Sequence, residues 1–271
     1  MSLHTVKVLE INITNSSKKE ILELLKKYCE SGVRKTAKTL IIVTPNPEQI
    51  VYAETDAHFV DFLNQADVAI PDGVGVVWAS RVLSSSPVSN VIPGVEFMED
   101  VIDMSSKRGY PVALIVGRQG VAIKAFECLR QKYPRLRGLA MDAPQLYIGP
   151  SGLSGDIDKA YFDRLAKKLV EKGVRVVFVG LGSPKQEYFI EKLASQDTLL
   201  RTQESVLPLV FMSVGGAFDE IAGRLVRPPQ WVNSFGLKWL WRLILEPWRI
   251  KRQLALMTFV YLVLRKRYTL K

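Results

Sequence analysis

The chain has 271 residues, of which 48% are hydrophobic, and its 37 lysines and arginines against 27 aspartates and glutamates give a formal net charge of +10. This composition excludes an intrinsically disordered chain, and two cysteines exclude a disulfide scaffold. The length suits one large domain, or one domain with an appendage.

The excess positive charge lies entirely at the C-terminal end. Residues 224–271 contain eleven basic residues and one acid, Glu246, whereas residues 1–223 are neutral. Four of the five tryptophans also fall in residues 224–271. We therefore expect a core of residues 1–223 and a basic, Trp-rich appendage of residues 224–271. Such an appendage needs an acidic partner, which is a membrane, a nucleic acid or a phosphorylated substrate.

Short β-rich runs alternate with longer helical stretches along the core. The expected strands are Met1–Asn15, Thr39–Val43, Asp67–Ile70, Pro111–Val116, Leu139–Met141, Arg175–Val179 and Leu207–Ser213. The expected helices are Lys18–Ser31, Pro47–Gln65, Glu96–Lys107, Val121–Lys132, Lys159–Lys172 and Pro184–Ala194. Continuous apolar strands alternating with helices predict an α/β fold, a mainly parallel sheet with helices on both faces.

The N-terminal residues lack the basic start and apolar core of a secretory signal. Cys29 and Cys128 fall on different expected helices, so nothing pairs them. These features predict a reduced, cytoplasmic protein.

The appendage contains one uncharged apolar run, Leu254–Leu264, with basic residues on both sides. Its eleven residues reach about 16 Å as a helix, which is too short for a hydrocarbon core about 30 Å thick. We expect this helix to lie in the headgroup region of a membrane. The alternative is a helix buried against a partner subunit, which would make the protein a homo-oligomer.

Ligands of parallel sheets collect where strands end and helices begin. Asp72 follows an expected strand and could take a proton from a hydroxyl group, or Pro71-Asp72-Gly73 could be turn chemistry alone. Thr44 and Asn46 could bind a sugar or ribose, or cap the helix that begins near Pro47.

Two further turns carry polar residues. Gln186 and its neighbour Glu187 open a helix, where an acid is also favourable for the helix dipole alone. Asp219 could bind a nucleotide or cap its own helix. The sequence Gly180-Leu181-Gly182 lacks the third glycine of a dinucleotide-binding motif, which disfavours an NAD enzyme. The two histidines fit neither a catalytic triad nor a zinc site.

Taken together, six segments resemble the WecG/TagA/CpsF family of bacterial glycosyltransferases. They occur in order and carry the resemblance from about residue 5 to residue 265. The segments are Thr44–Ala53, Pro71–Arg81, Ile92–Met98, Val179–Glu187, Val214–Arg224 and Arg227–Arg249.

The resemblance implies an inverting, metal-independent transferase with a Rossmann-like core, no cofactor, and a place on the inner face of the cell membrane. It implies transfer of N-acetylmannosamine or a similar sugar from a UDP-sugar donor to a polyprenyl-diphosphate-linked acceptor, in cell-envelope or exported polysaccharide synthesis. Asp72 would be the catalytic base, with Thr44 and Asn46 beside it. The donor would be bound by Gln186, Gly182, Gly216 and Asp219. The arginines expected to meet the lipid diphosphate and the membrane are Arg224, Arg227, Arg242, Arg249 and Arg252.

One position departs from the family pattern. The family often has an arginine before the Pro-Gly turn, where this chain has Val91. Arg81 or an arginine of the appendage is expected to replace it. The competing hypothesis is a non-enzymatic, basic nucleic-acid-binding protein.

Overall fold

The computed structural model describes residues 3–31, 39–149, 152–196, 208–224, 229, 232, 238–245 and 250–269. The chain divides into two compact units. Unit 1 is formed by Met1–Ser17, Thr44–Pro93 and Val226–Lys271, and unit 2 by Lys18–Val43 and Gly94–Leu225.

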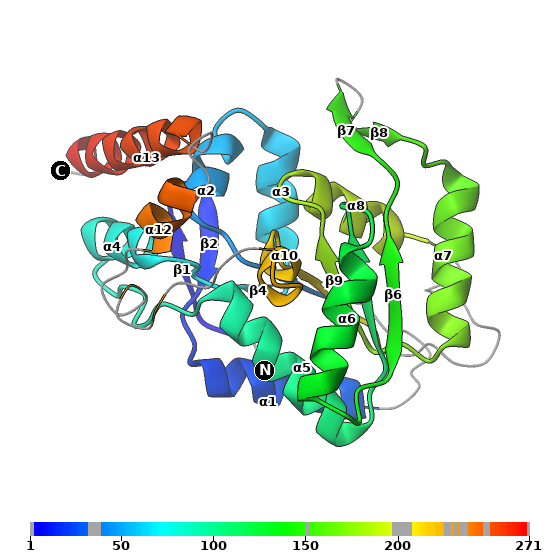
Figure 1. Cartoon of the computed structure of the whole chain (residues 1–271). Helices are drawn as coiled ribbons and strands as arrows, with labels where there is room; N and C mark the ends of the chain where they lie inside the picture. The colour runs from blue at the N-terminus through cyan, green and yellow to red at the C-terminus, as the bar shows by residue number, and fades with distance from the viewer. Residues whose placement is uncertain are drawn as a thin grey trace. The chain divides into compact units, whose positions relative to one another are not determined.

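Unit 2 contains five strands of a six-stranded sheet, and these five are parallel (Figure 1). Across the sheet they follow the order β3 (Leu40–Val43), β10 (Val210–Ser213), β9 (Val176–Gly180), β5 (Val112–Val116) and β6 (Gly138–Asp142). The helices of this unit are α1 (Lys18–Glu30), α5 (Gly94–Arg108), α6 (Val121–Lys132), α7 (Lys159–Glu171), α8 (Lys185–Ala194) and α10 (Ala217–Ile221). A hairpin of β7 (Leu146–Gly149) and β8 (Gly152–Gly155) precedes α7. The α/β fold with a parallel sheet is therefore confirmed.

The centre of the sheet is apolar throughout. Every residue of β5 and β10 is buried, and so are the first four of β9, as expected for strands covered on both faces. The register places Val116 opposite Gly180 and Val179 opposite Ser213. The turns that follow β5, β9 and β10 consequently start at one edge of the sheet.

Unit 1 combines a hairpin, a short strand and five helices among its described residues. They are β1 (Thr5–Val8), β2 (Ile11–Thr14), α2 (Pro47–Ala53), α3 (Ala57–Gln65), β4 (Val68–Ala69), α4 (Val74–Leu83), α12 (Lys238–Leu245) and α13 (Ile250–Thr269). Helix α13 packs against α2 and α4, beside which it lies in Figure 1.

Two expected elements are divided in the structure. The single strand expected over Met1–Asn15 is the antiparallel hairpin β1–β2, because the chain turns at Leu9 with φ 53°. The single helix expected over Pro47–Gln65 is broken into α2 and α3, because Asp56 accepts a hydrogen bond from the Phe59 N–H and starts a new helix. Helix α4 and the hairpin β7–β8 have no counterpart in the sequence-based prediction.

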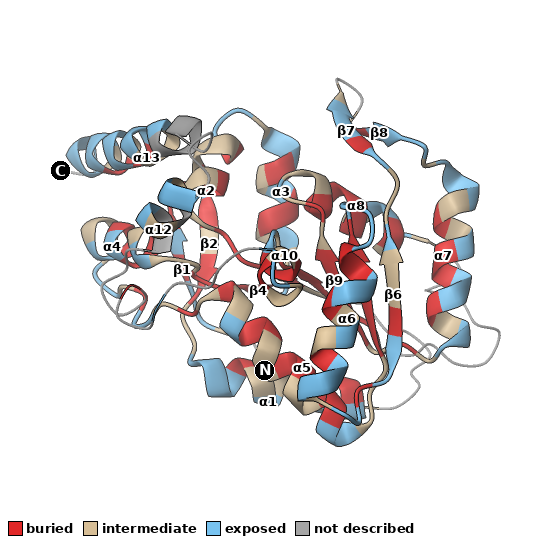
Figure 2. Cartoon of the chain, in the orientation of Figure 1, coloured by how far each residue is buried: buried red, intermediate tan, exposed pale blue. Residues whose placement is uncertain are grey.

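Residues Val226–Lys271 are grouped with unit 1, and the division into a core and an appendage stays a prediction. Helix α13 is amphipathic: Phe259 and Val263 are fully buried, whereas most of its other described side chains are partly or fully exposed (Figure 2). None of the described helices combines the length and the apolar character that crossing a bilayer requires. The role of residues 224–271 in membrane contact stays a prediction.

Candidate functional site

In unit 1, Asp72 lies in a loop that is held from two sides. Its backbone N–H donates to the carbonyl oxygen of Pro45 at 3.2 Å, and the N–H of Ile92 donates to the carbonyl oxygen of Pro71 at 3.1 Å. Asp72 itself is half-buried, and Gly73 takes φ 98° before α4 begins. The structure therefore brings together three of the six segments, those around Pro45, Asp72 and Ile92.

Asn46 acts as the N-cap of α2, as the capping alternative expected. Its Oδ1 accepts from the Gln49 N–H at 3.0 Å, and the Gln49 Oε1 accepts from the Asn46 N–H at 3.1 Å. This capping box fixes the start of α2 beside the Asp72 loop. Thr44 is buried at the end of β3. The part of both residues in substrate contact stays a prediction.

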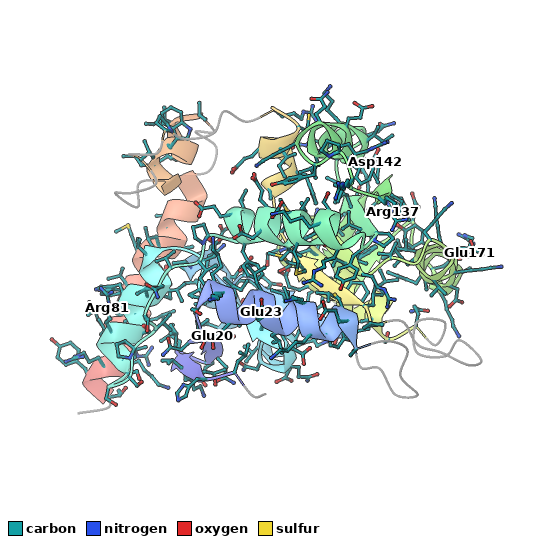
Figure 3. All side chains as sticks on the ribbon, turned by 90° about the horizontal axis from the view of Figure 1, so that it is seen from below. Glu20, Glu23, Arg81, Arg137, Asp142 and Glu171 are labelled. Carbon is teal, nitrogen blue, oxygen red and sulfur yellow. The ribbon has the colours of Figure 1, made fainter. Side chains whose placement is uncertain are left out.

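Val91 directly precedes Ile92, whose N–H donates to the Pro71 carbonyl oxygen, so Val91 is close to the Asp72 loop. Arg81, the proposed replacement for the family arginine, is in the last turn of α4, where Figure 3 labels it, whereas Asp72 precedes the first turn of that helix. At about 1.5 Å per residue, the length of α4 puts roughly 10 Å between Val74 and Arg81. Which arginine replaces the family arginine stays a prediction.

In unit 2, the turns that follow β5, β9 and β10 are packed tightly on one another. The Gly117 N–H donates to the Gly180 carbonyl oxygen at 3.3 Å. A Cβ on Gly180 would lie 2.9 Å from the Gly215 carbonyl oxygen and 2.7 Å from the Phe218 ring. Only glycine fits at position 180, so this residue lets the three turns meet at the edge where ligands of parallel sheets bind.

These turns include Gln186, Gly182 and Gly216, which are expected to bind the UDP-sugar donor. The Gly182 carbonyl oxygen accepts from the Gln186 N–H at 3.1 Å. The Gln186 side chain is buried, and its Oε1 accepts from the Gly215 N–H at 2.9 Å. Gly216 is exposed beside it. Helix α10, which follows, has five residues, so its dipole is a weak anion site.

Asp219 forms an ion pair that the sequence did not indicate. Its Oδ1 lies 3.1 Å from the Arg118 guanidinium, which is largely exposed. Arg118 follows β5 in the turn Gly117–Gly120. In the same turn the Gly120 N–H donates at 2.7 Å to Asp142, which is labelled in Figure 3. The backbone N–H of Arg224 donates to the Asp219 carbonyl oxygen at 2.9 Å, so the exposed Arg224 lies near Asp219.

A cavity of about 230 Å³ opens beside the turns after β5 and β9. Its lining includes Gly117, Gln145, Tyr147, Leu181 and Lys185. Sequence reasoning missed Tyr147 and Gln145 because the hairpin that carries Tyr147 was not predicted. The sequence shows that the basic residues Arg118 and Lys185 follow strands. Which residues surround them is decided only by the tertiary fold.

Glu187 is fully buried in the first turn of α8. Its Oε1 accepts from the Gln186 Nε2 at 2.8 Å. Burial raises the pKa of the Glu187 carboxyl to about 7, against the opposite effect of hydrogen bonds from Gln186, its own N–H and Ser183. The helix-dipole alternative does not account for an acid placed inside the protein.

The remaining expected residues belong to the appendage. Arg227 and Arg249 lie outside the described residues, and Arg242 and Arg252 are placed only as backbone positions in α12 and α13. Within the described parts of the chain, no group of three or more His, Cys, Asp or Glu side chains is arranged to hold a metal ion. Metal independence stays a prediction.

The sequence matches a known family and proteins of known description. The model of the glycosyl transferase WecG/TagA/CpsF family matches residues 6–271. The chain is 28% identical over 229 residues to an N-acetylglucosaminyldiphosphoundecaprenol N-acetyl-beta-D-mannosaminyltransferase of Bacillus subtilis, covering 83% of this chain and 79% of that protein. It is 27% identical over 271 residues to a Staphylococcus aureus protein of the same description, covering 98% of this chain and 94% of that protein. The chain belongs to the glycosyl transferase WecG/TagA/CpsF family.

Proposed function

We propose that this glycosyltransferase moves N-acetylmannosamine or a similar sugar from a UDP-sugar to a polyprenyl-diphosphate-linked acceptor sugar. The two relatives are described as acting on N-acetylglucosaminyldiphosphoundecaprenol and as forming a β-mannosaminyl linkage. A single displacement at the anomeric carbon inverts its configuration, so an α-linked nucleotide sugar would give the β product.

The observation that carries the proposal is the setting of Asp72. Its loop is clamped between the Pro45 carbonyl oxygen on one side and the segment at Ile92 on the other. A half-buried carboxylate on a clamped loop can accept the proton of an acceptor hydroxyl as that oxygen attacks the donor. Thr44 and Asn46 precede α2 in the adjoining segment and are assigned to the same acceptor.

The donor nucleotide is assigned to the turns of unit 2. Tyr147 and Gln145 line the cavity and offer a ring face and an amide, which suit a pyrimidine base. Lys185 in the same lining, and Arg118, which directly follows the lining residue Gly117, supply positive charge for the diphosphate. As the bond to the sugar breaks, such charges stabilise the leaving nucleotide without a metal ion.

The membrane surface is assigned to the exposed row of α13. Leu254, Met257, Tyr261, Leu264 and Tyr268 recur at intervals of three and four residues and are all exposed. Basic side chains flank this row, which is the composition of a helix lying in the headgroup region. The protein would then be peripheral on the inner face of the membrane, where lipid-linked acceptors are accessible.

The proposal is tested by screening UDP-sugars against an N-acetylglucosaminyl-diphospho-polyprenol acceptor and measuring released UDP. We expect release that needs both substrates, with UDP-N-acetylmannosamine among the productive donors, and that persists in excess EDTA. Absence of release with every donor would contradict the proposal. Tight, salt-sensitive binding to RNA or DNA without any binding of UDP would support the nucleic-acid hypothesis instead.

A further inference from the structure

Glu187 is the buried acid that the proposed reaction does not yet use. Both Glu187 and Gln186 have almost no exposed surface. Burying a carboxyl group costs free energy that an apolar side chain in the same place would not cost. An acid in this position therefore calls for a role beyond packing.

The Gln186 amide is held at both ends. Its Oε1 accepts from the Gly215 N–H at 2.9 Å, and its Nε2 donates to the Glu187 Oε1 at 2.8 Å. A backbone N–H and an amide nitrogen can only donate, so the Gln186 oxygen faces Gly215 and the Gln186 nitrogen faces an accepting oxygen of the Glu187 carboxyl group. The two contacts therefore require the same orientation of the amide, and flipping it would break both.

The Gly215 end of these contacts is held by close packing. Gly215 adopts φ 54°, and its carbonyl oxygen lies against Gly180. Glu187, Gln186 and Gly215 thus form a continuous chain of contacts from the first turn of α8 to the turn after β10.

This chain of contacts ends close to the expected nucleotide contact. Gly215 precedes α10, whose Asp219 pairs with Arg118 at 3.1 Å. The phenyl ring of Phe218, which is next to Asp219, packs against Gly180. A shift of the Gly215 turn would consequently move Asp219 and its arginine partner.

We propose that Glu187 is a positioning residue for the donor nucleotide: it fixes the orientation of the Gln186 amide, which holds the Gly215 turn and places Asp219. The inference rests on the proposed function, because the ligand is the UDP part of the donor. In this proposal Gln186 supports donor binding by holding the Gly215 turn, and its buried amide does not contact the nucleotide itself.

The experiment compares Glu187→Met with Glu187→Gln in the full chain. Methionine keeps the length of the side chain and removes the acceptor, whereas glutamine keeps an oxygen that can accept from Gln186. We expect the Kd for UDP, measured by calorimetry, to rise about tenfold in Glu187→Met, on the scale of one lost hydrogen bond. We expect Glu187→Gln to stay within about threefold of wild type. Ser105→Ala, which removes a buried hydroxyl on α5, is the matched control.

A second variant and a second readout keep the test decisive. Gln186→Met should weaken UDP binding as much as Glu187→Met, and the double variant no further, because both act through one chain of contacts. Hydrogen exchange of residues 213–217 should quicken in both single methionine variants and not in Glu187→Gln. The donor KM should rise while the acceptor KM stays unchanged.

Unchanged UDP affinity in a folded Glu187→Met variant would overturn the inference while leaving the proposed function intact. Additive effects of the two methionine substitutions would also overturn it. If Glu187→Met does not fold, unchanged UDP affinity in Gln186→Met overturns it. If the wild-type protein itself binds no UDP, the proposed donor is wrong and the inference fails with it.

Discussion

Gly75 and Pro47 pack so closely that a Cβ built on Gly75 would lie 2.8 Å from the Pro47 Cγ. Pro47 is the first residue of α2, directly after Asn46, and Gly75 is in the first turn of α4, just after the Asp72 loop. The ring of Phe259 from α13 lies 3.9 Å from the same point. This contact sets the spacing between the two segments to which the acceptor is assigned.

We therefore expect Gly75→Ala to lower both stability and turnover. The proline ring cannot rotate away, so the start of α4 must move, at a cost of about 1–3 kcal/mol in the free energy of unfolding. Turnover should fall by about tenfold or more, because the Asp72 loop moves with the helix. Thermal unfolding and UDP release measure the two effects. Gly149→Ala, where a Cβ meets its nearest neighbour at 3.8 Å, is the control. Wild-type thermal stability and wild-type UDP release in Gly75→Ala would show that the Gly75–Pro47 contact does not restrict the residue at position 75.

The buried Glu187 makes stability depend on pH. Burial raises the pKa of the Glu187 carboxyl to about 7 in the folded protein, above its ordinary value of 4.5. Between these two pH values the folded protein therefore keeps a proton that the unfolded chain has lost. The contribution of Glu187 is fully present below pH 4.5 and is lost as the pH rises toward 7. The free energy of unfolding, measured with urea between pH 5 and 7.5, should fall with rising pH in the wild-type protein. The fall should be smaller in Glu187→Gln. Parallel curves for the two proteins would refute this assignment.

The two cysteines should differ in reactivity. Cys29 is buried in α1, and burial raises the pKa of its thiol to about 11, whereas Cys128 is only half-buried. The thiolate is the reactive form, so a raised pKa and lack of access both slow the reaction. A thiol reagent should modify Cys128 first and Cys29 only on unfolding, which Cys128→Ser isolates. Fast labelling of native Cys128→Ser would contradict the packing of α1.

The exposed row of α13 predicts a specific loss of membrane binding. Replacing Met257 and Tyr261 by serine removes two apolar side chains that are 71% and 61% exposed, so the fold should be retained. Binding to vesicles of phosphatidylglycerol and phosphatidylcholine should weaken by about tenfold or more, as expected for apolar surface removed from a bilayer.

The control for this loss is Ile123→Ser, which removes from α6 an apolar side chain that is 57% exposed. Retained vesicle binding in the double serine variant would contradict the assignment of α13 to the membrane. Conversion of a dimer into a monomer by the same variant would instead support the partner-subunit alternative.

Most elements of unit 2 could be predicted because buried parallel strands and amphipathic helices leave strong patterns. Helix Val121–Lys132 has the predicted bounds. The break between α2 and α3 was readable in principle, since Asp56 is a good N-cap residue. The turn at Leu9 was not, because leucine rarely adopts a positive φ.

Candidate site residues were predictable where a residue type and a turn coincide, as at Asp72. Glu187 illustrates the limit. An acid in the first turn of a helix is usually exposed, and only the packing of α8 on β9 and β10 decides that this one is buried. The pairing of Arg118 with Asp219 likewise joins residues 101 positions apart in the sequence.

The central claim is that Asp72 is the base of a sugar transfer to a lipid-linked acceptor. The most direct measurement follows labelled N-acetylmannosamine from its UDP donor into N-acetylglucosaminyl-diphospho-polyprenol, for wild type and Asp72→Asn at saturating substrates. Asparagine keeps the shape of the loop and removes the base, so we expect transfer to fall by about a hundredfold or more with unchanged UDP affinity. Wild-type transfer by Asp72→Asn would contradict the account.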